Sequence, residues 1–463
     1  MENPHRRQRS PGIKLLFAVL VAAALAVPLF MTYALVWDRQ DQSNTARSAI
    51  TQGWGGAQTV TGPVAIVPYA VNLTETEVVD GKRVEKVRRV VRDLYLSPQR
   101  QEVETTLDPE RRSKSIYESV IYRARLSGTA RFALPQEDLK RLNIAPGSLM
   151  LDKAELHFGV SDPRGMQSAS RITAGGKTLD PRPGGGLRST GNSGFFAPLA
   201  WDGAAPLTVE WAYDLRGSEH ISLIPRGGDT RWHVKSAWPH PSFSGSFLPS
   251  QSKIGGDGFT AEFEIPDLAL GQGLVATIDN AEPPAPGGMD AYAMRAAERG
   301  SSLVASVAMV EPVDLYSRID RSVKYGFLII GFTFLAFLMF DIVAGASVSG
   351  PEYLLTGAGL VLFFVLLLAF SEVIGFAAAY AAASVAIIGL VTAYSAAVLK
   401  SWGRAKVIGA LLVGLYALLF VLLNLEAWSL LIGSILLFLA LAGVMYATRN
   451  VDWQGLGRSG DEA

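Results

Sequence analysis

The sequence predicts an integral membrane protein with six transmembrane α-helices, one N-terminal and five C-terminal, around a large, mainly β extracytoplasmic domain. Long apolar runs occur near the N-terminus and throughout the last third of the chain. Charged residues make up 18% of the sequence, below the roughly 25% typical of soluble domains, and they concentrate between residues 38 and 324. That middle region alternates apolar and polar residues with the period of two expected of β-strands.

The first apolar run extends from Leu15 to Val36 without a charged residue and is long enough to cross a bilayer. It follows a basic head, residues 1–14, that would remain in the cytoplasm. A cleaved signal peptide is the alternative, because Ala24-Leu25-Ala26 resembles a cleavage site. The apolar run continues well past Ala26, so we expect an uncleaved anchor over residues 15–36.

Five further apolar runs predict a transmembrane bundle over residues 325–448. The expected spans are 325–344, 353–371, 373–399, 407–424 and 428–448. Their short connections are typical of antiparallel helix hairpins. Gly375, Ala379 and Ala383 put a small residue at every fourth position, a spacing that allows helices to approach closely in lipid.

Basic residues in short loops predict the orientation. Placing both termini in the cytoplasm puts Lys400, Arg404 and Lys406 there, together with the tail at residues 449–463. Residues 37–324 then lie outside. The basic residues just before the second span run against this rule, but charges attached to a long translocated domain carry less weight.

Within residues 37–324 the chain is expected to form antiparallel sheets of a sandwich or barrel-like kind. The segments 119–132, 207–215 and 259–265 each place apolar side chains on one face and polar ones on the other. Runs rich in glycine and proline separate the strands. Helical exceptions are expected at residues 39–53, 136–144 and 289–299.

Several segments resemble the CreD family of bacterial inner-membrane proteins. They include WGGAQTVTGPVAIVPY at 54–69, SDPRGM at 161–166, SAWPHPSFSGSFLP at 236–249 and the ending LLNLEAWSLLIGSILLFLALAGVMYATRNVDW. The similarity runs in order from about Lys14 to Trp453. Asp341 departs from the glutamate expected there, and Lys114-Ser115 replaces an Arg-Gly pair. The resemblance implies a multi-pass inner-membrane protein with a periplasmic domain, linked to envelope integrity and to envelope-stress and β-lactam responses, and it supplies no catalytic mechanism.

The sequence contains no recognisable catalytic or metal-binding pattern. There is no cysteine, which rules out disulfides and thiolate chemistry. Four of five histidines (His157, His220, His233 and His240) fall in the middle domain without the spacing of a zinc site, and His157 is expected at an exposed strand position. No GxSxG segment occurs. We therefore assign no catalytic residue, cofactor or metal.

Three acidic residues in the bundle are candidate functional groups. Asp341, Glu372 and Glu426 adjoin apolar runs, where a charge is costly unless it is paired or near water. The simpler interpretation puts them at the membrane interface, where they set the helix boundaries. Alternatively, Glu372 and Glu426 share an outer acidic pocket that serves proton coupling or cation binding.

The segment WPHPSFSG at 238–245 supplies the other candidates. Prolines 239 and 241 restrain the backbone around His240, and Trp238 and Phe243 offer large apolar surfaces. The structural interpretation is a rigid turn packed into the core. The functional interpretation is a surface loop that binds a partner or an envelope component. The basic run at 82–92 also has two interpretations: a solvated strand face, or a surface attracted to anionic lipids or polymers.

Two functions remain open at this level. The first is a non-enzymatic envelope-integrity protein whose periplasmic domain contacts an envelope protein or a peptidoglycan-related partner. The second is a transporter or lipid-handling protein that uses the outer acidic residues. The lipid bilayer is an expected partner in both, and a net charge of zero gives no reason to expect nucleic acid.

Overall fold

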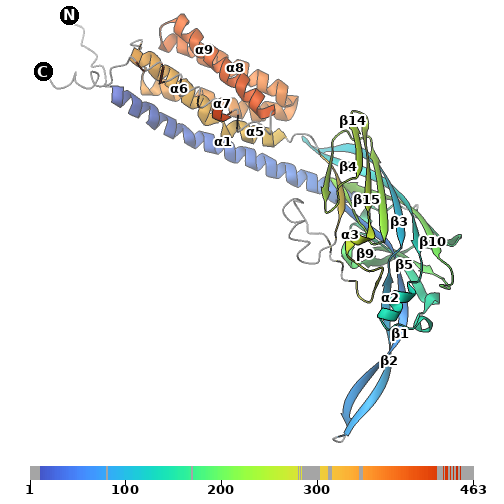
Figure 1. The fold of residues 1–463 in the computed structure, drawn as a ribbon. Coiled ribbons are helices and arrows are strands. Elements are labelled where there is room, and N and C mark those ends of the chain that lie inside the picture. The colour runs from blue at the N-terminus through green and yellow to red at the C-terminus, as the bar shows by residue number, and fades with distance from the viewer. Residues whose placement is uncertain are drawn as a thin grey trace, which may run out of the picture. The chain divides into compact units, whose positions relative to one another are not determined.

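A computed structural model describes residues 11–79, 82–167, 170–279, 281, 283, 303–310, 315–343, 348–424 and isolated positions between 431 and 449. The chain divides into two compact units. The helical unit comprises Met1–Asn44 and Val313–Ala463, and the β unit comprises Thr45–Pro312. The predicted class, apolar helices on both sides of a large mainly β domain, is confirmed (Figure 1).

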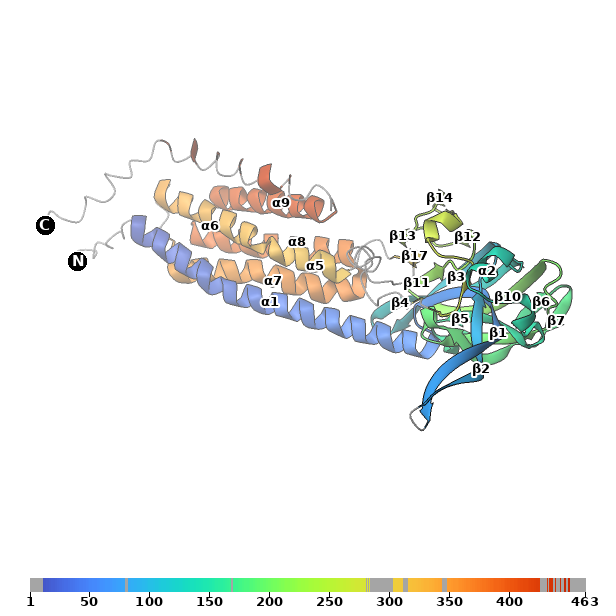
Figure 2. The same cartoon turned by 60° about the horizontal axis from the view of Figure 1, so that its bottom comes forward.

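Five of the described helices are long and apolar enough to cross a membrane. They are α1 (Pro11–Trp54), α6 (Gly326–Val343) with the preceding α5 (Leu315–Lys324), α7 (Gly350–Ile374), α8 (Phe376–Val398) and α9 (Trp402–Asn424). Figure 2 shows α1 and α5 to α9 side by side in the helical unit. The sixth predicted span, 428–448, lies largely outside the described residues, as does the helical piece expected at 289–299.

Helix α1 is much longer than a membrane span. Its 44 residues extend about 66 Å at the usual rise per residue, twice the thickness of the hydrocarbon core. The helical continuation expected at residues 39–53 is therefore present and unbroken. The helix belongs to the helical unit as far as Asn44, and its last turns belong to the β unit.

Small residues organise the contact between neighbouring helices. Helix α7 ends at Ile374, and Gly375 then adopts a positive φ of 77° before α8 begins at Phe376. Ala379 and Ala383 are completely buried, as expected of the small-residue spacing.

The β unit is a sandwich of two sheets. The nine-stranded sheet contains β1 (Gln58–Val79), β2 (Lys82–Leu96), β5 (Ala154–Val160), β8 (Arg182–Leu187), β9 (Ser193–Leu199), β11 (His220–Ile224), β13 (Pro241–Gly245), β16 (Val275–Ala276) and β17 (Ala305–Met309). The eight-stranded sheet contains β3 (Arg100–Lys114), β4 (Tyr117–Phe132), β6 (Arg171–Ala174), β7 (Lys177–Leu179), β10 (Leu207–Ser218), β12 (Asp229–Ser236), β14 (Gln251–Gly255) and β15 (Gly258–Ile265). Short helices α2 (Gln136–Arg141) and α3 (Asp267–Leu270) complete the unit.

The inner faces of the two sheets form one hydrophobic core. The Phe158 ring of the nine-stranded sheet lies 6.0 Å from Trp211 of the eight-stranded sheet, measured between ring centroids. In β4, β10 and β15 the apolar residues predicted to share a face are buried, and polar residues alternate with them towards solvent.

Two strand pairs differ from the expected antiparallel pattern. Strand β1 runs parallel to β11, and β12 runs parallel to β3. Each sheet therefore contains one parallel pair among antiparallel ones and is mixed.

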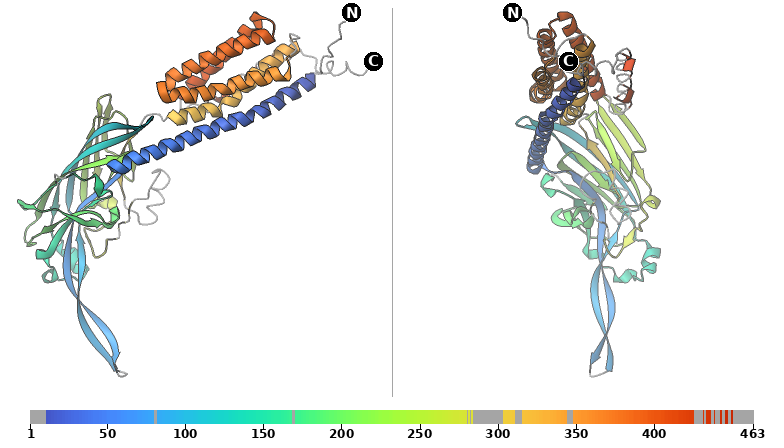
Figure 3. Two further views of the ribbon diagram at one scale, coloured as in Figure 1. Left: turned by 180° about the vertical axis from the view of Figure 1, so that it is seen from behind. Right: turned by 90° about the vertical axis from the view of Figure 1, so that its left-hand side faces the viewer.

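Strands β1 and β2 continue as a two-stranded ribbon beyond the sheet, as Figure 3 shows. Their ladder extends to the pair Val79 and Lys82, whereas pairing of β1 with β5 covers only Val60–Ile66. Lys86 to Arg89 are exposed on this ribbon, so this part of the basic run at 82–92 faces solvent.

Candidate functional site

Glu372 lies in the last turn of α7, where three helices of the helical unit meet. Its side chain is 13% exposed, and its Oε1 lies 3.8 Å from Nε of Arg39 in α1. The same oxygen accepts a hydrogen bond of 3.2 Å from the Tyr316 hydroxyl of α5. A paired carboxylate near the end of a span is the arrangement that makes a charge tolerable there.

The basic residues that precede the second span lie on α5, which is amphipathic. Tyr316, Ile319 and Val323 are buried, and Lys324 pairs with Asp320 at 2.6 Å. One of these basic residues is therefore paired within its own helix.

For the other two candidates in the bundle, Asp341 and Glu426, the structure describes no contact with Glu372. Asp341 lies in the last turn of α6, and its side-chain surroundings are outside the description. Glu426 lies outside the described residues. The shared acidic pocket of Glu372 and Glu426 therefore stays a prediction.

The candidate segment at 238–245 is packed into the β unit, and its residues Pro241–Gly245 form β13, which pairs with β17. Trp238 is 8% exposed, and its indole nitrogen donates to the Val310 carbonyl at 3.1 Å. Phe243 makes edge-to-face contacts with Phe259 and Phe263 at centroid distances of 5.8 and 6.2 Å. Of the three candidates here, only the His240 side chain is exposed.

The expectation that His157 is exposed is wrong. Its residue is 7% exposed, because β5 lies inside the nine-stranded sheet and the Phe196 ring of β9 and the Gly185 backbone of β8 lie against the imidazole. The His157 ring stacks on Phe196 at 5.5 Å and contacts the Gly185 carbonyl and the Glu155 carboxylate. In the described part of the chain, no group of three or more acidic or histidine residues could hold a metal ion.

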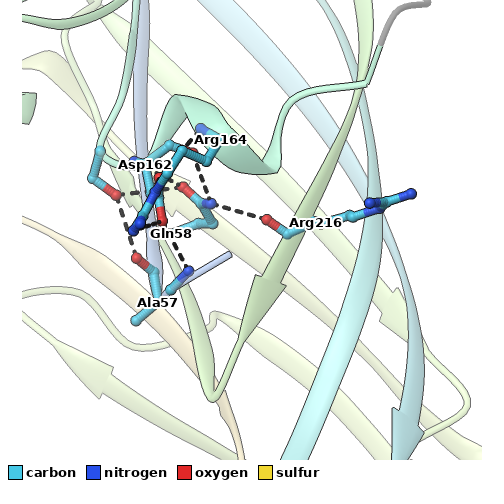
Figure 4. A network of polar contacts seen from close by, with 7 residues as sticks. Ala57, Gln58, Asp162, Arg164 and Arg216 are labelled. Atoms are coloured by element: carbon cyan, nitrogen blue, oxygen red, sulfur yellow. Dashed lines mark hydrogen bonds and ion pairs between the residues drawn. The ribbon is translucent and has the colours of Figure 1, made fainter. Parts of the chain in front are cut away.

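Two of the segments quoted above, 54–69 and 161–166, meet in a polar network that sequence reasoning missed (Figure 4). Gln58 is completely buried, and its amide nitrogen donates to the carbonyls of Asp162 at 3.1 Å and Arg216 at 2.9 Å. Its amide oxygen accepts from the backbone nitrogen of Asp162 at 3.2 Å. One glutamine side chain therefore links three separate stretches of backbone.

Asp162 completes this junction. Its carboxylate accepts two hydrogen bonds of 2.8 Å from the Arg164 guanidinium and one of 3.0 Å from the Gly56 amide. The bonds from Arg164 are the main reason that the pKa of Asp162 lies below its usual value. Gly165 is required because a Cβ there would lie 2.2 Å from the Arg216 carbonyl oxygen.

Trp54, the last residue of α1, gathers arginine side chains beside this network. The guanidinium carbons of Arg112, Arg216 and Arg123 lie 4.2, 4.4 and 5.7 Å from its ring. Such cation–π contacts stabilise clustered guanidinium groups and restrict their orientation. We call Trp54 and these three residues the arginine cluster.

The arginine cluster borders a wide cleft on the solvent face of the eight-stranded sheet. The cleft has a volume of about 1270 Å³ and is lined by residues of β3, β4, β10, β12, β14 and β15. Its charged lining comprises five basic residues and three aspartates: Arg123, Arg125, Arg216, Lys235, Lys253, Asp108, Asp214 and Asp257. The basic residues outnumber the aspartates by two, and this excess favours an anionic ligand.

Comparison with known proteins places the chain in a family. The family model described as "Inner membrane protein CreD" matches residues 10–454. The Inner membrane protein CreD of Escherichia coli (strain K12) is 31% identical over 436 residues, which cover 93% of this chain and 90% of that protein. The matched region includes both the apolar helices and the β unit. The chain therefore belongs to the CreD family of inner membrane proteins.

Proposed function

We propose that this chain supports the integrity of the bacterial cell envelope as a non-enzymatic binding protein. In this proposal the helical unit anchors it in the inner membrane, and the β unit, on the periplasmic side, contacts an envelope component. The observation that carries the proposal is the cleft with its five basic residues beside the arginine cluster. A preformed, charged cleft on a rigid sheet favours recognition of a ligand.

The proposed orientation places both termini in the cytoplasm. It can be tested directly because the chain has no cysteine, so that any introduced thiol is unique. Ser252 is exposed on β14, and Ser401 lies between α8 and α9. We expect a membrane-impermeant maleimide to label Ser252→Cys in intact cells with a permeabilised outer membrane, and to label Ser401→Cys only after lysis. The reverse pattern would contradict the proposed orientation.

The alternative function, transport or lipid handling through the bundle acids, is favoured by one observation. Glu372 is largely buried and interacts with both Arg39 and Tyr316, as a coupled carboxylate would. The two functions differ in what they require of this carboxylate. A binding protein tolerates its neutralisation, whereas a proton- or cation-coupled transporter does not.

Complementation separates the two functions. A deletion strain would carry the intact gene or the Glu372→Gln/Glu426→Gln variant at equal protein level, and survival would be measured under detergent and β-lactam challenge. The binding proposal expects both genes to restore survival. If only the intact gene does, transport becomes the better account, and if deletion causes no sensitivity, the envelope role is refuted.

A further inference from the structure

The solvent face of the eight-stranded sheet carries basic residues at a regular interval. Strand register aligns Lys253, Thr260, Lys235, Thr106 and Arg125 in one row across β14, β15, β12, β3 and β4. All five line the cleft. A cation therefore stands on every second strand, with a threonine hydroxyl between, and neighbouring cations are about 9.5 Å apart at their Cα atoms. We call these five residues the basic row.

The charges of the two lysines are available to a ligand. Arg125 lies 3.8 Å from Asp214, which extends the row on β10. Within the described part of the chain, neither Lys235 nor Lys253 forms an ion pair, and both are exposed. Their ammonium groups can therefore meet a ligand anion without first breaking a protein contact.

An acidic row runs beside the basic row, one side-chain repeat along the strands. Glu262, His233 and Glu104 occupy matching positions on β15, β12 and β3. They line a second cleft of about 470 Å³ that shares Lys235, Lys253 and both threonines with the first. The two rows are roughly 7 Å apart, so a flat anionic surface pressed on the sheet would be repelled by the glutamates.

From these rows we propose that the cleft binds a single linear polyanion, a glycan strand that carries carboxylate groups on alternate sugars, lying across the strands along the basic row. This inference rests on the proposed function, since it requires the β unit to face the periplasm. The carboxylates would pair with the cations, and the threonine hydroxyls would hydrogen-bond the intervening sugar. The acidic row would keep the strand from moving towards that side of the basic row.

The interval between cations favours a glycan over an acidic peptide. In an extended peptide, side chains on one face repeat every 6.6–6.8 Å or so, which does not match the cation interval. A peptide would also satisfy its backbone by pairing with a sheet edge rather than by crossing the strands. In a glycan with an anionic group on alternate sugars, successive anions are separated by two sugar rings, and the chain has no peptide backbone that needs a sheet edge.

The test measures binding of the full chain in detergent micelles to peptide-free glycan strands prepared from bacterial cell wall, which retain their lactyl carboxylates. A chitooligosaccharide of equal length serves as the neutral probe. We expect the intact chain to bind the carboxylated strands, more weakly as salt is raised, and to bind the neutral probe at least about fivefold more weakly. Equal binding of both probes, or no binding of the strands, would overturn the proposal.

Matched variants locate the site. Lys235→Gln/Lys253→Gln should weaken binding by about five- to tenfold, because each lost contact is an exposed ion pair. Lys153→Gln/Lys177→Gln removes the same charge from exposed positions outside the cleft and should leave binding unchanged. Equal unfolding temperatures of the two variants would show that both are folded. Equal affinities of the two variants would overturn the proposed site.

Two further probes test the other possible ligands of the cleft, an acidic protein and an anionic membrane. Stronger binding to polyglutamate, or to vesicles of anionic phospholipid, than to the glycan strands would overturn the proposal in favour of a protein or a membrane. The result of these binding measurements does not depend on the result of the survival assay. Glycan binding without any survival defect on deletion would refute the proposed function alone, and a survival defect without glycan binding would refute the proposed ligand alone.

Discussion

Replacing Gln58 by alanine tests the junction between the two segments at residues 54–69 and 161–166. The side chain is fully buried and bonds to three backbone groups: the carbonyls of Asp162 and Arg216 and the amide of Asp162. The Asp162 carbonyl also accepts from the Gly165 amide at 3.2 Å, so the cost of losing the glutamine falls on the other two groups. A buried backbone group left without a partner costs about 1–3 kcal/mol. The space vacated can admit a water molecule, so we take the lower end of this range for each of the two groups and expect a loss of about 2 kcal/mol.

The assay is hydrogen exchange of the full chain in detergent, followed by mass spectrometry on peptides from β4 and β10. This reports the opening free energy of the β unit without requiring the whole chain to unfold in one step. A loss of about 2 kcal/mol corresponds to a roughly thirtyfold decrease in protection. The control is Gln251→Ala, at an exposed position of β14, which should change stability by less than about 0.5 kcal/mol. If Gln58→Ala lowered protection by no more than the control, the network would not stabilise the β unit.

Three other predictions follow from single contacts. The pKa of Asp162 is lowered chiefly by Arg164, so its charged form stabilises the fold above the unfolded pKa of about 3.9, and this stabilisation is lost as pH falls through the lower folded value. Asp162→Asn should therefore lower the unfolding temperature at pH 7 and flatten its decline towards pH 3; an unchanged decline would contradict this. Trp238→Phe keeps an aromatic ring but removes one hydrogen bond to a backbone carbonyl and part of the buried indole, and thermal unfolding should show a loss of at least about 1 kcal/mol. No loss would mean that this bond adds nothing to stability. A double-mutant cycle on Arg39→Gln and Glu372→Gln should give a coupling below about 1 kcal/mol, because the pair is 3.8 Å apart and Arg39 is 38% exposed. A larger coupling would favour a functional role for this pair.

The elements themselves could be predicted because each depends on local periodicity. A run of apolar residues such as Phe376–Val398 can satisfy its backbone in lipid only as a helix. Alternation such as that of Leu207, Val209 and Trp211 identifies the buried face of a strand without knowledge of its neighbours.

The pairing of these elements could not be predicted from the sequence. Gln58 and Asp162 are 104 residues apart, and nothing in either segment specifies that they touch. His157 shows the same limit, since its burial results from contacts with Phe196 and Gly185 on a face that the local pattern marks as polar. The cleft likewise depends on a register shared by six strands, two of which pair in parallel.

The candidate residues show where residue type alone was insufficient. Trp238 and Phe243 are large and apolar, and they are found packed against neighbouring residues rather than presented to solvent. The basic residues of the cleft stand at separate positions in β4, β10, β12 and β14 and form no run in the sequence. Only the fold brings them to one surface, which is why the run at 82–92 was the more conspicuous basic feature.

The central claim is that the β unit supports the envelope by binding through its cleft. Its most direct test is survival of the deletion strain under detergent and β-lactam challenge when it carries Lys235→Gln/Lys253→Gln, compared with Lys153→Gln/Lys177→Gln at equal protein level. The account predicts that the cleft variant fails to restore survival and that the control variant restores it fully. Full rescue by both variants would contradict it.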